Sequence, residues 1–349
     1  MLSIALVKHF TSNVYLKAQI ILGFLFFIYS CSNISIENKI SGQTMGTTYN
    51  VKIIHSTAIE NIDQVKFEID SILVDFNKQM STWIDDSEIS IFNKTLSTEP
   101  FKISDEFFYV LEEGKVINQL TDGAFDFTVF SLAANWGFGP DSLVIVDNPE
   151  EDKIRQILSY TGSDKIELDY PFIKKTNPHV QLDLNAIAKG YAVDLVYGWL
   201  QRSGFKNLFI EIGGEIRCSG LNKEGKNWVI GIDSPMENSN QRIFTTVQLQ
   251  NASLATSGNY RNYLERDGEK ISHTINPATG MPVLTNVLSV SVRSQNCLSA
   301  DAWATALMVM TYEKGREKIN SMDNLEAFWI LSDQNGNLDQ RYTKDFFKK

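Results

Sequence analysis

Asp301 and Thr305 are the two residues whose types and spacing point most directly to chemistry. They lie in a helix predicted over about residues 299–310. Because residues four apart share one face of a helix, the carboxylate and the hydroxyl would point the same way. Two hard oxygen ligands at one place suit Mg²⁺, which takes one or two protein carboxylates alongside water and phosphate. The alternative is that Asp301 favours the positive helix end and Thr305 bonds the carbonyl four residues back.

A second candidate segment, residues 182–192, runs from a predicted strand into a predicted helix through small side chains. Small residues at a helix start let backbone groups approach a ligand, and the helix N-terminus favours anions. In the alternative interpretation, Asp183 or Asn185 is an ordinary N-cap and Lys189 is a solvated surface charge.

Weaker signals come from glycines, a histidine and aromatic residues in loop-like contexts. The pair Gly213 and Gly214, between two predicted strands, indicates a tight turn or a close backbone contact with a ligand. A polar loop is predicted over residues 255–261, before His273, and an isolated histidine is commonly structural or exposed. Trp83 and Trp136 could stack on a flat ligand or simply pack their loops.

Hydrophobic periodicity predicts the elements that must position these residues. Helices are predicted at 61–80, 105–120, 150–160, 185–202, 299–310 and 313–321. Strands are predicted at 47–54, 180–184, 207–212, 215–219, 227–232, 243–249, 287–293 and 325–331. Because helices and strands come in blocks and not in strict alternation, the sequence predicts an α+β fold with mainly antiparallel sheets flanked by helices.

Composition narrows the class of protein. The 349-residue chain is 43% hydrophobic and 21% charged, which is typical of a globular protein. Its net charge of -10, without a run of basic residues, argues against a nucleic-acid partner. Beyond Cys31, only Cys218 and Cys297 remain, too few for a disulfide scaffold, and we expect both to be buried thiols. No Cys/His cluster indicates zinc or an iron-sulfur centre.

The N-terminal residues have the layout of a targeting segment. Lys8 and Lys17 precede an uncharged apolar run at 18–29, which predicts a signal peptide over residues 1–30. The run is shorter than the roughly 20 residues of a membrane-spanning helix, which is the alternative interpretation. Because Cys31 follows Ser30 as in a bacterial lipobox, we expect lipidation at Cys31 and a tether over 31–41. The protein would then be exported and anchored to a membrane on the periplasmic side.

In their order along the chain, these stretches resemble the ApbE family of FAD:protein FMN transferases. The matching stretches are 42–49, 80–83, 121–126, 136–139, 183–192, 212–215, 255–258, 273–277 with 279–280, and 300–305. The resemblance spans residues 42 to 331. It implies that 42–349 form one ApbE-like catalytic unit with two lobes.

The resemblance also implies an activity and its cofactors. An enzyme of this family uses Mg²⁺ to cleave FAD and transfers FMN, through a phosphoester, to a Thr or Ser hydroxyl of a redox protein, releasing AMP. The acceptor would be a subunit such as those of sodium-pumping Nqr-type or Rnf-type complexes. The implied metal ligands are Asp301, Thr305 and the backbone carbonyl of Ala186. The implied FAD contacts are Met45, Trp83, Ala124, Phe125, Asp126, Asp183, Lys189 and Ile275.

Two points stay open at the level of sequence. The acceptor hydroxyl must lose its proton during attack, and either His273 or a metal-linked Asp301 is able to take it. Two other functions would keep the same motifs. Water could replace the protein hydroxyl, giving a Mg²⁺-dependent FAD pyrophosphatase that releases FMN and AMP, or the chain could be a non-enzymatic flavin-binding lipoprotein.

Overall fold

The computed structural model describes residues 35–140, 149–235, 243–259, 263–266 and 269–348. The predicted signal peptide and Cys31 therefore lie outside the described residues. Most of the segment expected to be a tether is instead a strand, because β1 (Ile36–Thr44) pairs along its whole length with β2 (Thr47–His55). The side chains of this edge strand are mostly polar, so no hydrophobic periodicity predicted it. No helix in the described ranges is both long and apolar enough to cross a membrane.

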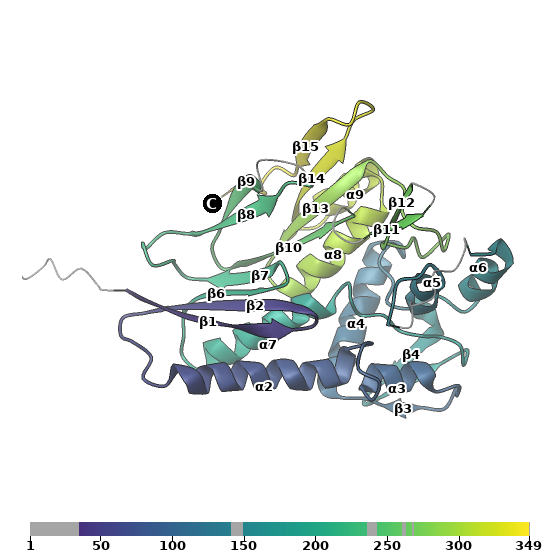
Figure 1. Ribbon diagram of the computed structural model, residues 1–349, viewed down its shortest axis with the longest axis horizontal. Helices are drawn as coiled ribbons and strands as arrows, with labels where there is room; N and C mark the ends of the chain where they lie inside the picture. The colour runs from purple at the N-terminus through teal and green to yellow at the C-terminus, as the bar shows by residue number, and fades with distance from the viewer. Residues whose placement is uncertain (1–34, 141–148, 236–242, 260–262, 267–268, 349) are drawn as a thin grey trace, which may run out of the picture.

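A large antiparallel sheet forms the centre of the molecule (Figure 1). Its eight strands lie in the order β1, β2, β6 (Asn207–Ile212), β7 (Glu215–Ser219), β10 (Ala252–Gly258), β13 (Val287–Ser294), β14 (Glu326–Ser332) and β15 (Leu338–Tyr342). Every neighbouring pair in it is antiparallel. The predicted α+β class with mainly antiparallel sheet is confirmed.

Smaller sheets complete the strand content of the described residues. They are β3 (Phe101–Lys102), β5 (Phe172–Lys175) and β4 (Ile166–Asp169) in that order, β8 (Trp228–Asp233) with β9 (Ile243–Leu249), and β11 (Tyr263–Arg266) with β12 (Glu269–Ser272). Apolar residues of the β8–β9 pair, among them Ile230 and Val247, share a buried cluster with Leu254 of β10 and Phe328 of β14. The pair therefore covers part of the large sheet.

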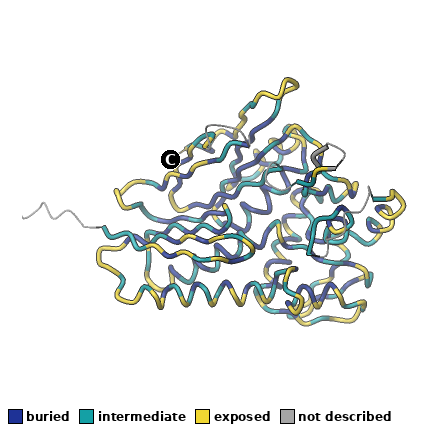
Figure 2. The backbone as a smooth tube through the Cα atoms, viewed as in Figure 1, coloured by how far each residue is buried: buried dark blue, intermediate teal, exposed yellow. Residues whose placement is uncertain are grey.

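The helices are α2 (Ile62–Met80), α3 (Glu88–Lys94), α4 (Asp105–Leu120), α5 (Phe130–Asn135), α6 (Glu151–Leu158), α7 (Ala188–Arg202), α8 (Cys297–Val309) and α9 (Tyr312–Asn320). In α2 the buried residues recur every three or four positions from Val65 to Met80, so one face packs inward and the other stays in water. Figure 2 shows this alternation of buried and exposed backbone along α2. By contrast, α8 is buried on nearly all sides and packs against α7, β10 and β13.

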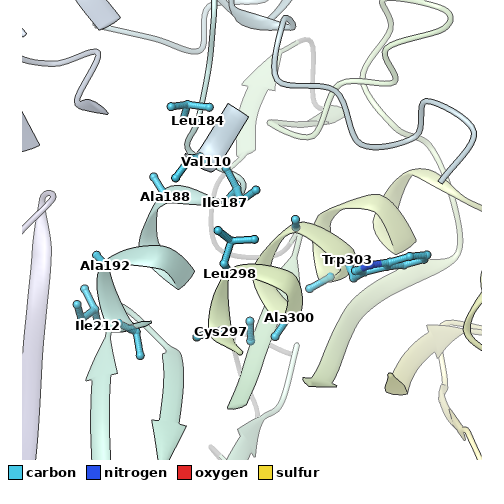
Figure 3. Packing of buried hydrophobic residues seen from close by; sticks show 14 of the residues in the cluster. Val110, Leu184, Ile187, Ala188, Ala192, Ile212, Cys297, Leu298, Ala300 and Trp303 are labelled. Carbon is cyan, nitrogen blue, oxygen red and sulfur yellow. The ribbon is translucent and has the colours of Figure 1, made fainter. Parts of the chain in front are cut away.

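Helices α7 and α8 lie side by side and pack against each other (Figure 3). A Cβ at Gly190 of α7 would lie 2.3 Å from the backbone carbonyl oxygen of Cys297 in α8, so only glycine fits there. One turn further along α7, Asp194 accepts hydrogen bonds from the backbone N–H groups of Cys297 and Leu298, both at 2.9 Å. Arg217 of β7 also donates to Asp194, at 2.6 Å. A carboxylate from α7 thus caps the positive N-terminus of α8.

Two predicted elements near the candidate site are wrong. Residues 180–184 belong to no strand, because the Asn93 side chain takes the place of a partner: it donates to the Leu182 carbonyl at 2.8 Å and accepts from the Leu182 N–H at 2.7 Å. Most of the loop predicted at 255–261 is part of β10. Its hydroxyls suit a buried strand because Thr256 bonds Ser291 at 2.8 Å.

Gly190→Ala should destabilise the protein, because the added methyl group would force α7 away from α8. Overpacking of this kind costs about 1–3 kcal/mol, and we expect a loss near the upper end in urea-induced unfolding. Gly198→Ala on the same helix is the matched control. Its methyl group would meet only the flexible end of Arg202, so alanine's higher helix propensity should leave stability equal or higher. Equal losses in the two variants would contradict the close contact.

Lys175 of β5 gives a pH-dependent prediction. It is 1% exposed, and its Nζ donates to the carbonyls of Phe92 at 2.8 Å and Thr95 at 2.9 Å, at the end of α3. Burial lowers the pKa of Lys175 to about 8, from 10.5 in an open chain. Between these values the unfolded chain binds more protons than the folded one, so this residue's contribution to the free energy of unfolding rises with pH.

The measurement is the free energy of unfolding of the wild type minus that of Lys175→Met, at several pH values. The difference should be flat below pH 8 and then increase toward pH 10.5, by at most about 1.4 kcal/mol per pH unit. Subtracting the variant removes the effect of the other lysines and tyrosines. A difference that stays flat or falls across this window would show that Lys175 keeps its proton when buried.

Candidate active site

A cavity of about 1020 Å³ brings most of the predicted site residues together. Ten predicted residues lie in its wall: Ala124, Phe125, Asp126, Asp183, Ala186, Lys189, His273, Ile275, Asp301 and Thr305. The Gly213–Gly214 turn and the start of β2 also line the cavity. The wall thus draws on segments from Thr47 to Val309, which are far apart in sequence.

Two of the implied FAD contacts are not among the residues of this wall. Met45 lies in the turn between β1 and β2 in a left-handed conformation, with φ of 50°, and packs partly against the main core. Trp83 follows the end of α2, and 67% of it is exposed. By contrast, Trp136 is buried, and its Nε1 donates to the Gly280 carbonyl at 2.7 Å, which supports the packing interpretation for this tryptophan.

Asp301 and Thr305 lie one helical turn apart on α8 and both face the cavity, as their spacing predicts. Asp301 is 3% exposed, and its Oδ2 accepts a hydrogen bond from the Gly190 N–H at 2.9 Å. Thr305 Oγ1 lies 3.2 Å from Ser257 Oγ of β10. Burial raises the pKa of Asp301, while Lys189 and the Gly190 N–H oppose that shift. The close approach of α7 and α8 therefore fixes the carboxylate in the wall.

Lys189 is not the solvated surface charge of the alternative interpretation. Its Nζ lies 2.8 Å from Glu215 Oε1 and 4.0 Å from Asp301 Oδ1. Burial alone would lower the pKa of Lys189, but the two carboxylates hold it above its ordinary value. The ammonium therefore stays charged in this corner of the cavity, where it is suited to an anionic ligand.

Glu215 is a member of this corner that sequence reasoning did not assign. It is the first residue of β7 and is 4% exposed. Its Oε2 is buried and has no hydrogen-bond partner among the described residues. Burial raises the pKa of Glu215, against the pull of Lys189. The sequence did offer one signal for this role. Glu215 is an acidic residue that directly follows the Gly213–Gly214 pair and begins the mostly buried strand β7.

Residues 183–187 form the turn that leads into α7. The Asp183 carboxylate accepts from the Asn185 N–H at 2.8 Å, and the Asp183 N–H donates to the Phe127 carbonyl at 2.8 Å. The helix therefore begins at Ala188 and not at 185, and its N-terminal turn, with Lys189, borders the cavity. Helix N-termini favour anions, so this end of α7 is suited to phosphate oxygens.

The Asp126 carboxylate is engaged in hydrogen bonds within the protein. It accepts hydrogen bonds from the Thr128 N–H at 2.8 Å, the Ser163 N–H at 3.0 Å and the Asn118 side chain at 3.1 Å. Burial raises its pKa, and these donors oppose the shift. The carboxylate therefore fixes the loop 124–126, which leaves the loop's backbone and Phe125 to form the cavity wall.

His273 also lines the cavity and lies directly after β12. Its ring meets Phe138 edge-on, with centroids 6.4 Å apart. On either side of it, Ser272 and Thr274 donate to the Asn259 side chain at 2.6 and 3.0 Å. The histidine is thus presented from a segment that hydrogen bonds hold in place.

The corner around Asp301 fits a hard cation. Asp301 and Thr305 of α8 and Ala186 of the turn before α7 all line the cavity, and the carboxylate, the hydroxyl and the Ala186 backbone carbonyl would supply the oxygen ligands that Mg²⁺ prefers. The unpartnered Glu215 Oε2 shows that the corner still lacks a hydrogen-bond donor. No three His, Cys, Asp or Glu side chains in the described part of the chain are grouped to hold a metal. A cation here would therefore complete its shell with water and phosphate, as Mg²⁺ does.

Comparison with known proteins gives the same assignment over nearly the whole chain. Residues 45–329 match the ApbE family. The FAD:protein FMN transferase of Vibrio cholerae is 41% identical over 291 residues, which cover 83% of this chain and 86% of that protein. The protein of the same name from Haemophilus influenzae is 37% identical over 304 residues, covering 85% and 87%.

Solved structures agree in fold. The flavin transferase ApbE from Vibrio cholerae superposes with a TM-score of 0.82 at 37% identity, covering 89% of this chain and 98% of that one. The apo form of the Pseudomonas stutzeri flavinyl transferase ApbE gives 0.81 at 32% identity, covering 90% and 98%. With sequence and fold in agreement, this chain belongs to the ApbE family.

Proposed function

We propose that this chain is an FAD:protein FMN transferase that uses Mg²⁺. It would transfer the FMN half of FAD to a Thr or Ser hydroxyl of an acceptor protein, form a phosphoester and release AMP. The observation that carries the proposal is the corner in which Asp301, Thr305 and Lys189 meet inside a cavity of about 1020 Å³. This volume reaches the upper end of the roughly 300–1,000 Å³ of ordinary ligand sites, as a dinucleotide requires.

The chemistry of a diphosphate explains why these residue types are needed. Negative charge spreads over the phosphate oxygens as the bond between the two phosphates breaks, so catalysis depends mainly on positioning and on positive charge. Asp301, Thr305 and the Ala186 carbonyl would hold Mg²⁺, which supplies charge neutralisation at those oxygens. Lys189 and the N-terminal turn of α7 add an ammonium and backbone N–H groups on the same side.

His273 is the better placed group to take the proton of the acceptor hydroxyl. The Asp301 carboxylate is buried, accepts the Gly190 N–H and lies beside Lys189, and in this proposal it also binds the cation. His273 also lines the cavity, from the segment directly after β12 and not from α8. We therefore assign His273 as the general base and Asp301 as a metal ligand.

The N-terminal layout supports a cellular context for this reaction. A signal peptide over 1–30 and lipidation at Cys31 would place the catalytic unit on the periplasmic side of a membrane. In the structure, β1 begins at Ile36, so a lipid on Cys31 would hold the folded domain close to that membrane. A membrane-bound redox subunit of the Nqr or Rnf type is the acceptor we propose.

Asp301→Ala should abolish Mg²⁺-dependent transfer, with a loss of at least about 10²-fold, because the cation loses its carboxylate. The assay incubates the full chain with FAD, Mg²⁺ and the acceptor subunit, and weighs the acceptor by mass spectrometry. Asp85→Ala is the control, since that carboxylate is 99% exposed. EDTA should reproduce the Asp301→Ala result in the wild type. Normal transfer by a folded Asp301→Ala protein would remove the metal role of this residue.

His273→Ala should lower the transfer rate by roughly 10²–10⁴-fold, the usual effect of losing a general base. Binding of FAD, followed by quenching of its fluorescence, should change little, and added imidazole should restore part of the rate. A variant that stays within a few fold of the wild type would assign the proton transfer to another group.

The same assay separates transfer from hydrolysis. A transferase gives an acceptor heavier by FMN less one water, together with AMP. Release of free FMN with an unmodified acceptor would instead show an FAD pyrophosphatase. Absence of any FAD cleavage would show a flavin-binding protein without turnover.

A further inference from the structure

Glu215 combines deep burial with an incomplete set of hydrogen bonds. It follows the turn Gly213–Gly214, whose two glycines have positive φ values of 62° and 110° and reverse the chain at the cavity. Its Oε1 accepts from Lys189 at 2.8 Å, but its Oε2 has no partner in the described residues. Leaving a buried charged oxygen unpaired is costly, so such an atom calls for an explanation.

Another glutamate in the same wall shows that the missing partner is specific to Glu215. Glu211 also lines the cavity, but its Oε1 accepts from the Gly214 N–H at 2.8 Å and its Oε2 accepts from Asn50 at 2.7 Å. The protein therefore satisfies one carboxylate with its own groups. The other, which shares Lys189 with Asp301, keeps one oxygen without a hydrogen-bond partner among the described residues.

The two carboxylates of the corner lie close enough together for one water-bridged arrangement. Lys189 Nζ lies 2.8 Å from Glu215 Oε1 and 4.0 Å from Asp301 Oδ1, so these two oxygens are at most about 7 Å apart. A carboxylate oxygen, a Mg²⁺ ion, a bound water and a second carboxylate oxygen in series also span up to about 7 Å, with about 2.1 Å per metal bond and about 2.7 Å for the hydrogen bond.

We infer that Glu215 is a positioning residue of the cation site: its Oε2 accepts a hydrogen bond from a water bound to the cation that Asp301 and Thr305 hold. The inference rests on the proposed function. Oε1 stays with Lys189 and keeps that ammonium in the corner. Mg²⁺ usually retains several of its waters, and outer partners of this kind orient the ligands of a metal site.

The test measures metal affinity, not activity, with Mn²⁺ as the probe. Free Mn²⁺ is followed by its electron paramagnetic resonance signal while it is added to the full chain, with FAD absent and with FAD present. Glu215→Gln keeps the shape of the side chain and removes its charge, and it should weaken Mn²⁺ binding about 10- to 100-fold. Glu211→Gln, with the same charge change in the same wall, should stay within about threefold.

Glu215→Asp separates charge from position. It keeps the negative charge but withdraws the oxygens by one methylene group, so it should also bind Mn²⁺ more weakly than the wild type. Wild-type affinity in Glu215→Asp would show that charge alone matters and would overturn the inference. Affinity of Glu215→Gln within threefold of the wild type, in a protein with an unchanged melting temperature, would overturn it as well.

The outcomes also separate this inference from the proposed function. If the wild type binds Mn²⁺ and Asp301→Ala does not, the cation site stands, and only the Glu215 variants decide the role of Glu215. If the wild type itself binds no Mn²⁺ with FAD present, the proposed cation chemistry fails, and the inference fails with it.

Discussion

The contact between α7 and α8 at Gly190 is the constraint on which the site depends. Because Gly190 has no side chain, its backbone reaches the Cys297 carbonyl and its N–H reaches the Asp301 carboxylate. Asp194, one turn later, caps α8 from the same side. The contact that packs the two helices therefore also sets where Lys189 and Asp301 stand relative to each other.

The parts of the fold that could be predicted from sequence are those whose signal is local. Helices α2 and α4 have a polar and an apolar face, and the structure gives both within one residue of the prediction. The predictions for β10 and for residues 180–184 were wrong because the conformation of both segments depends on partners that are distant in sequence. Small hydroxyl residues suit a strand only if β13 and α8 supply their hydrogen bonds, and an apolar run stays outside the sheets where Asn93 occupies its backbone groups.

The candidate site shows the same division. The spacing of Asp301 and Thr305 predicted a shared face, and both line the cavity. The role of Lys189 could not be predicted from its own helix, because its ion-pair partner, Glu215, comes from a strand. Asp126, implied as a ligand contact, lines the cavity and also holds its own loop with its carboxylate, through partners that its own segment does not reveal.

The cavity wall begins at Thr47 in β2 and is completed by residues of α8. Chains emerge from the ribosome N-terminus first. The β2 residues of this wall are therefore synthesised about 250 residues before those of α8. A chain that stops before α8 therefore lacks one side of the cavity wall.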